Sequence, residues 1–88
     1  MGYTGKVIVL SKHALAYMPE RGFNEMEVQA ASALGEWVPG ERGKLECRMD
    51  IPFGGEWNGK FYQTRQIRPI FADDHDAVVV ITVYTYYF

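Results

Sequence analysis

The last twelve residues, 77–88, form an unbroken run of β-branched, aromatic and small side chains that reaches the final position. A run of this kind is typical of a strand covered on both faces, because a half-exposed strand alternates apolar with polar residues. Strict alternation predicts two faces, with Val78, Val80, Tyr84 and Tyr86 on one and Val79, Ile81, Val83 and Tyr87 on the other. We expect the chain's own helices to cover one face, and a ligand or partner to meet the aromatic end of the other.

Length and composition set the class of protein. A chain of 88 residues makes one domain, residues 1–88, and its 48% hydrophobic content excludes a disordered chain. Surplus aromatic surface on so small a domain favours a partner. The lone Cys47 cannot form an internal disulfide, and the sequence shows neither a secretory leader pattern nor an apolar run of membrane-spanning length. We therefore expect a soluble cytoplasmic protein without membrane association.

Charge is distributed unevenly along the chain. The net charge of −2 disfavours nucleic acid as a partner, yet residues 42–68 carry +3 and the remainder carries −5. Such a basic segment can bind phosphates on one side of the protein, so the whole-chain charge is a poor guide. Solvated charges on alternating strand faces explain the same pattern without a ligand.

The first half of the chain predicts helices. Residues 6–10 suit a short strand, and Ser11 is placed as the N-cap of a helix over residues 12–18. A second helix follows at Asn24, which forms a capping-box pattern with Glu27 three residues later.

The second half predicts strands. Residues 44–50 suit a strand that residues 51–55 then break, and Asn58-Gly59 is a strong hairpin signal within an alternating segment. Pro69 indicates an edge or a bulge. The prediction is an α+β fold with two N-terminal helices packed on a mostly antiparallel, twisted sheet of about four strands.

Three segments of the chain follow one order and spacing: Ser11–Leu15, then Glu20–Phe23 with Val28, and finally Val79–Tyr84. They place a histidine near the start of the first helix, Arg-Gly between the helices and Thr-Val-Tyr in the last strand. In this they resemble a small prokaryotic domain-of-unknown-function family grouped with the RelE-like and BrnT-like toxins. The resemblance implies a RelE-like fold and the toxin of a toxin–antitoxin pair, a metal-independent ribonuclease neutralised by a small antitoxin protein.

RNA cleavage without a metal needs a base for the 2′-hydroxyl proton, a cation for the phosphorane and an acid for the 5′-oxygen. His13 can serve as acid or base, because its reference pKa of about 6.5 lies near neutrality. Arg21 can clamp a phosphate in two-pronged geometry, and Tyr84 can donate a proton or stack on a base. Purely structural roles remain open for all three, such as a helix-start histidine or an arginine that suits a helix C-terminus.

Basic residues interleaved with aromatic residues on strands suit single-stranded RNA, which binds through phosphate contacts and base stacking. The predicted RNA contacts are Lys60, Tyr62, Arg65, Arg68 and Tyr86. Burial of the aromatic rings in the core is the alternative.

We expect no metal site and no cofactor, since the acidic residues around His75 suit a solvated turn. The alternative function is a non-catalytic protein- or nucleic-acid-binding module with a degenerate toxin fold, which the acidic remainder of the chain favours. The open edge implied by Pro69 is compatible with a homodimer or with strand addition by a partner.

Overall fold

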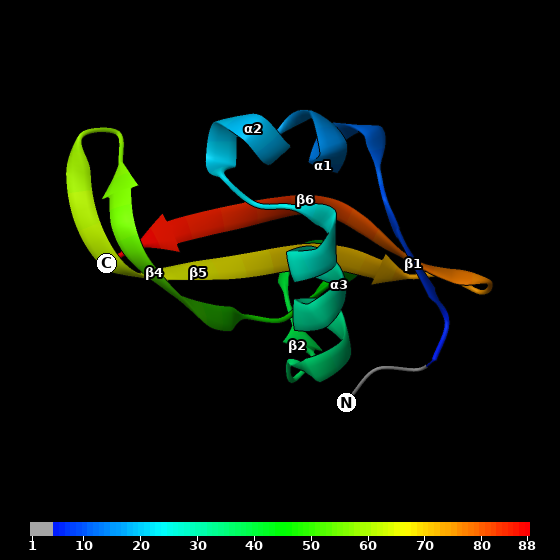
Figure 1. Ribbon diagram of the computed structural model, residues 1–88. Helices are drawn as coiled ribbons and strands as arrows, with labels where there is room; N and C mark the ends of the chain where they lie inside the picture. The colour runs from blue at the N-terminus through cyan, green and yellow to red at the C-terminus, as the bar shows by residue number, and fades with distance from the viewer. Residues whose placement is uncertain (1–4) are drawn as a thin grey trace.

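The computed structural model describes residues 5–88, and in this range three short helices cover one face of a mixed six-stranded sheet (Figure 1). The helices are α1 (Lys12–Ala16), α2 (Met18–Arg21) and α3 (Glu25–Leu34). The strands are β1 (Val7–Leu10), β2 (Val38–Pro39), β3 (Leu45–Glu46), β4 (Met49–Trp57), β5 (Lys60–Asp73) and β6 (Ala77–Tyr87), with a 3₁₀ turn, η1 (Glu41–Gly43), between β2 and β3.

Strand β5 is the central strand of the sheet and pairs with β3, β4 and β6. The strand order is β1-β6-β5-β3-β2, and β4 pairs with the first part of β5 while β3 pairs near its end. All of these pairs are antiparallel except β1 with β6, which run parallel. The face opposite the helices, called the open face below, is left uncovered by helix.

The predicted arrangement of two helices on a sheet of about four strands is wrong. The chain makes three helices because Pro19 lacks the N–H that would continue a helix, so the predicted helix over residues 12–18 divides at Tyr17. The sheet is larger because β1 pairs in parallel with β6 and β2 joins its other side. Residues 51–55 also bend the strand without ending it: β4 passes through them with a register shift between Pro52 and Gly55.

Local signals from the sequence are confirmed where they depend on neighbouring residues alone. The Ser11 hydroxyl accepts a hydrogen bond from the Ala14 N–H at 3.1 Å, and Asn24 and Glu27 form the reciprocal capping box. Asn58-Gly59 makes the two-residue turn between β4 and β5, with both residues at positive φ as a type I′ turn requires.

A bulge in β6 overturns the predicted division of its faces. Ile70 pairs with Thr82 whereas Phe71 pairs with Val80, so Ile81 is the extra residue on β6. The bulge switches the alternation, and Val78, Val80 and Val83 are all fully buried toward the helices. Past the bulge, Thr82, Tyr84 and Tyr86 therefore lie on the open face.

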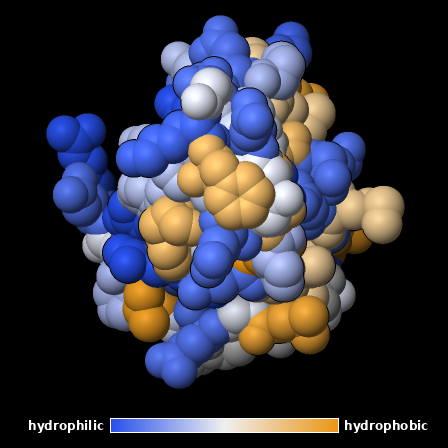
Figure 2. Space-filling view, turned by 60° about the vertical axis from the view of Figure 1, so that its left-hand side comes forward, coloured by the Kyte–Doolittle hydropathy of each residue, from blue (hydrophilic) through white to orange (hydrophobic). Residues whose placement is uncertain are grey.

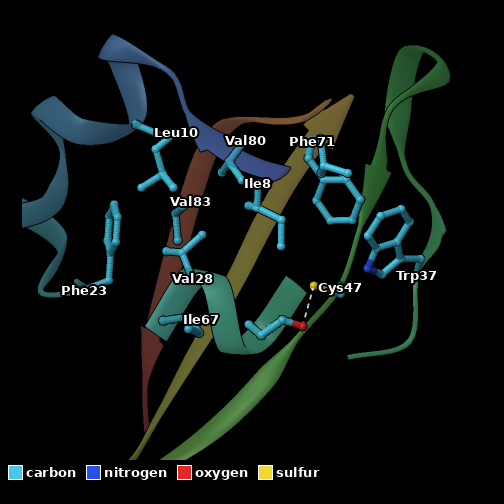
Figure 3. Packing of buried hydrophobic residues seen from close by; sticks show 13 residues of the cluster. Ile8, Leu10, Phe23, Val28, Trp37, Cys47, Ile67, Phe71, Val80 and Val83 are labelled. Atoms are coloured by element: carbon cyan, nitrogen blue, oxygen red, sulfur yellow. Dashed lines mark hydrogen bonds between the residues drawn. The ribbon is translucent and has the colours of Figure 1, made fainter. Parts of the chain in front are cut away.

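The core lies between the helices and β1, β5 and β6. Figure 3 shows Val28 of α3 close to Ile67 of β5 and Val83 of β6, and each of these side chains is fully buried. Trp37 packs edge-to-face on Phe71 with ring centroids 4.5 Å apart. These contacts fix the helices on one face of the sheet and hold β6 in its register.

Pro69 lies in the central strand β5 and is fully buried, so the predicted edge is wrong, whereas a bulge in the pairing of β5 with β6 does follow it, between Ile70 and Phe71. Its carbonyl accepts the Cys47 N–H at 3.3 Å, between the end of β3 and the start of β4. The missing N–H of proline points to the same side as its carbonyl, where the two partner strands are interrupted. Cys47 and Pro69 lie opposite each other in the register that β3 and β4 share, so this pair keeps one ladder hydrogen bond and lacks the one that an N–H at position 69 would donate to the Cys47 carbonyl.

Gly22 ends α2 in the left-handed conformation, with φ of 74°. A Cβ atom here would lie 2.3 Å from the Tyr87 hydroxyl oxygen and 2.7 Å from the Trp57 ring. Both the backbone conformation and the close approach of the C-terminal strand therefore require glycine.

We expect Gly22→Ala to lower the free energy of unfolding by about 2 to 4 kcal/mol, since it adds overpacking to the cost of positive φ. Gly43→Ala is the matched control, because Gly43 has φ of 73° and no atom lies within 4 Å of the position that a Cβ would occupy. The control should lose only about 1 kcal/mol. Urea unfolding followed by circular dichroism measures both, and equal losses would contradict the contact with Tyr87.

Candidate functional site

Four side chains contact one another in a row that crosses the free edge of β6. The His13 and Tyr17 rings meet edge-to-face with centroids 4.7 Å apart. The Arg21 guanidinium carbon lies 3.9 Å from the Tyr17 ring centroid and 5.1 Å from that of Tyr84. Four-residue spacing aligns His13, Tyr17 and Arg21 along α1 and α2. These four residues are called the edge row below.

Arg21 is held from both its side chain and its backbone. Its Nη1 donates to the Thr82 hydroxyl at 3.1 Å and to the Val83 carbonyl at 2.8 Å. Its own carbonyl accepts hydrogen bonds from the Thr85 hydroxyl at 2.7 Å and from the Tyr87 hydroxyl at 2.9 Å. Within residues 5–88 the guanidinium donates through Nη1 alone, so its other N–H groups are available to a ligand.

A hollow of about 480 Å³ lies beside the edge row on the open face. The β2–β3 connection forms one wall, and the strands β5 and β6 form the floor. Its lining residues are Glu41, Arg42, Lys44, Glu46, Arg68, Ile70, Thr82, Tyr84 and Tyr86. Tyr84 therefore belongs to both the edge row and the hollow.

A bidentate ion pair closes one side of the hollow. Arg68 Nε donates to Glu46 Oε2 at 2.6 Å, and Arg68 Nη2 donates to Glu46 Oε1 at 3.0 Å. Arg68 Nη1 also donates to the Tyr86 hydroxyl at 3.0 Å. The hydrogen bonds from Arg68 hold the pKa of Glu46 below its usual range, against the opposing effect of burial. Glu46 is therefore an ionised carboxylate at neutral pH, although its residue is only 8% exposed.

The structure brings together some of the predicted site residues. His13, Arg21 and Tyr84 form the edge row with Tyr17, and Arg68 and Tyr86 lie beside it in the hollow. Arg68 also lies near Tyr84, with its guanidinium carbon 5.6 Å from the ring centroid.

Arg65 lies elsewhere. It is three residues from Arg68 on β5 and therefore points to the helix-covered face, where it donates to the Gly22 carbonyl and to the Glu27 carboxylate. Its side chain is 14% exposed, so it positions α2 and α3 and does not reach the open face.

Lys60 and Tyr62 lie together at the hairpin end of the sheet, with Lys60 Nζ 5.6 Å from the Tyr62 ring centroid. The Tyr62 ring lies 5.6 Å from that of Tyr87, on the helix-covered side. Figure 2 looks toward this end of the molecule and shows separate hydrophobic side chains among hydrophilic ones. The five predicted RNA contacts therefore do not form one continuous surface.

The sequence alone does not reveal the role of Glu46. The residue is 22 positions from Arg68, and no local pattern links the two. Only the pairing of β3 with β5 places them side by side.

Other reactive groups have structural roles. Burial raises the pKa of the Cys47 thiol to about 11, and its Sγ donates to the Ala31 carbonyl at 3.3 Å (Figure 3).

Across residues 5–88, no group of three or more His, Cys, Asp or Glu side chains is arranged to hold a metal ion. In the same range, no helix is long and apolar enough to cross a membrane.

Comparison with known proteins finds no matching family profile, curated protein or solved structure. The resemblance to RelE-like and BrnT-like toxins therefore stays a prediction.

We expect Glu46→Gln to destabilise the protein most at neutral pH. The folded state lowers the pKa of Glu46, so its ion pair contributes stability above the ordinary value of 4.5 and loses it as pH falls through the folded pKa. The difference in unfolding free energy between wild type and variant should therefore shrink as pH falls below 4.5. Urea unfolding from neutral pH down to about pH 3 measures it. Glu36→Gln, at an exposed carboxylate, is the control, and a difference for Glu46→Gln that stays constant with pH would contradict the ion pair.

Proposed function

We propose that the protein is an RNA-cleaving toxin of a toxin–antitoxin pair, acting as a metal-independent ribonuclease. The edge row supports the proposal, because it places the imidazole of His13, the guanidinium of Arg21 and the phenol of Tyr84 one after another along one exposed surface. These are the base, the cation and the acid that cleavage at a 2′-hydroxyl requires.

The proposed reaction assigns one task to each group. Neutral His13 takes the proton from the 2′-hydroxyl, and the resulting oxygen attacks the adjacent phosphorus. Arg21 stabilises the charge of the phosphorane through the N–H groups that the protein leaves unused. The bond to the 5′-oxygen then breaks, and Tyr84 gives that oxygen a proton. The products are a 2′,3′-cyclic phosphate and a 5′-hydroxyl.

The hollow supports binding of the rest of the strand. Tyr84 and Tyr86 are each 41% exposed and offer stacking surfaces for bases, while Arg42 and Lys44 supply positive charge at the rim. The buried, unpaired thiol of Cys47 suits a reducing compartment, so we place the protein in the cytoplasm. A small antitoxin would neutralise it by covering the edge row.

A second candidate is an RNA- or protein-binding module without chemistry. Two observations favour it: Arg68 is already paired with Glu46, and Arg21 already donates to Thr82 and Val83. In this case the same surface binds single-stranded RNA or a partner protein and leaves it intact.

Purified wild type should cleave a labelled single-stranded RNA in EDTA, and His13→Ala should lower the rate about 100-fold or more, as loss of a general base does. His75→Ala is the matched control, because the His75 side chain is 95% exposed in the β5–β6 turn. Circular dichroism verifies that each variant folds.

Three outcomes separate the candidates. Cleavage that persists in His13→Ala contradicts the assigned base. RNA binding by a folded wild type without cleavage supports the binding module. A folded wild type that neither binds nor cleaves isolated RNA contradicts the ribonuclease and the RNA-binding module and favours the protein-binding module.

Expression of the wild-type chain in bacteria should arrest growth, since a ribonuclease toxin depletes messenger RNA. His13→Ala should relieve the arrest at equal protein level, and His75→Ala should not. Colony counts after induction, with immunoblots for protein level, measure the effect. Normal growth with wild type would contradict the toxin.

A further inference from the structure

We infer that the open face binds a second copy of this chain, so that two sheets pack face to face in a symmetric, reversible dimer. The contact lies where β1 pairs with β6. The inference goes beyond the proposed function and does not depend on it, because the state of assembly is measured without RNA.

The open face is apolar next to β1. Ile8 and Leu10 are buried under the helices, so alternation places Val7 and Val9 on the open face, where they are 67% and 44% exposed. The pairing of β1 and β5 with β6 places further apolar side chains beside them. Because none of these side chains is polar, the patch gains free energy when it leaves water. We call this patch the apolar end, and it comprises Val7, Val9, Ile70, Ala72, Ala77 and Val79.

Parallel pairing makes an uncovered patch unusual at this place. Parallel strands are normally covered on both faces and consist of continuous apolar runs. β1 pairs in parallel with β6, whose residues 77–81 are apolar throughout. Within residues 5–88 the helices cover only one face of this pair (Figure 1). We therefore expect another molecule to cover the second face.

An acidic turn adjoins the apolar end. The turn between β5 and β6 carries the carboxylates of Asp73, Asp74 and Asp76, and Lys6 Nζ lies 2.7 Å from Asp73 Oδ1. The turn and Lys6 together therefore carry a charge of −2. The side chain of Asp76 is 96% exposed, so this charge faces outward and is available to a partner.

An uncompensated cation lies on the other side of the apolar end. Arg21 crosses the free edge of β6 and reaches the open face. There its Nη1 donates to the Thr82 hydroxyl at 3.1 Å, and its guanidinium carbon lies 5.1 Å from the Tyr84 ring centroid. Among residues 5–88 Arg21 forms no ion pair with a carboxylate. Its remaining N–H groups can therefore bind a carboxylate of another molecule.

A two-fold axis perpendicular to the sheet at Val79 relates the acidic turn to Arg21. The turn lies about four residues before Val79, and Arg21 meets β6 at Thr82 and Val83, about four residues beyond it. Both groups therefore lie about 13 Å from the axis along the strand, at about 3.3 Å per residue. The turn lies toward β5 and Arg21 toward the free edge, so the rotation places the turn of one copy over Arg21 of the other.

The same rotation packs exposed side chains on less exposed ones. β1 and β5 lie on opposite sides of β6, so Val7 and Val9 of one copy meet Ile70 and Ala72 of the other. Sheets packed face to face lie about 10 Å apart, with side chains of both inner faces between them. The face therefore complements itself in apolar character and in charge, which identifies its occupant as a second copy.

Sedimentation velocity of the wild type should show a monomer at low protein concentration and a dimer at high concentration. Val7→Glu should weaken the dimer about 10-fold or more, because each added carboxylate would be buried against an apolar surface. Met26→Glu is the matched control and should leave the dimer unchanged, since Met26 is 81% exposed on α3, away from the open face. A wild type that is monomeric at every concentration would overturn the inference. A dimer that folded Val7→Glu leaves unchanged would overturn it too.

Charge reversal tests the arrangement within the dimer, and it decides the inference if Val7→Glu does not fold. One variant carries Asp74→Lys with Asp76→Lys, and the other carries Arg21→Glu. Each variant alone should be monomeric, because like charges then meet across the axis. An equal mixture should form a heterodimer, because opposite charges meet again at both contacts. If circular dichroism shows both variants folded and their mixture stays monomeric, the inference is wrong.

The result is separable from the ribonuclease proposal. The dimer covers Arg21, so it is the inactive form if the protein cleaves RNA, and only this consequence rests on the proposed function. A protein that dimerises through the open face and does not cleave RNA refutes the cleavage alone. A protein that cleaves RNA and is monomeric at every concentration refutes the dimer alone.

Discussion

The carbonyl groups of Arg21 and Gly22 accept three hydrogen bonds from the strands below them. Thr85 and Tyr87 of β6 donate to the first, and Arg65 of β5 donates to the second. These three hydrogen bonds, called the clamp below, fix the turn that ends α2. They thereby also fix the direction in which the Arg21 side chain leaves the backbone. The edge row exists only because this turn is held against the sheet.

The position of the α2 turn also protects the free edge of β6 beyond Val80. β1 pairs with β6 only as far as Val80, so the rest of that edge would be exposed to another strand. Arg21 Nη1 donates to the Val83 carbonyl on this edge, and α1 and α2 lie along it (Figure 1). The residues that protect the edge are thus those that the proposed chemistry uses, which ties the stability of the fold to the geometry of the site.

The sequence predicts those features of the fold, such as helix caps and a tight turn, that depend on residues close together in the chain. Ser11, Asn24 and the Asn58-Gly59 turn are each recognisable within four positions, and the structure confirms them. The four-residue spacing of His13 and Tyr17 also suits a shared helical face, whereas Arg21 joins them only because α2 continues beside α1. The bulge at Ile81 is different, because it depends on the pairing of β6 with β5, and it moves Thr82 and the following side chains to the opposite faces.

Strand pairing, which the sequence does not show, also decides which polar side chains meet at the site. Arg65 and Arg68 are three residues apart on one strand, so alternation alone places them on opposite faces, but only the packing of β5 decides that Arg65 lies under the helices and Arg68 in the hollow. Glu46 meets Arg68 only through the pairing of β3 with β5. A count of basic residues on strands therefore overestimates the basic surface on the open face.

The most direct measurement is an NMR titration of the protein with a short, non-cleavable single-stranded RNA carrying 2′-O-methyl groups. If the edge row binds RNA, resonances of His13, Tyr17, Arg21 and Tyr84 should shift together and saturate at one RNA concentration. Shifts that concentrate at Lys60 and Tyr62, at the hairpin end of the sheet, would contradict this binding. In that case the edge row would protect the edge of the sheet and have no part in binding RNA.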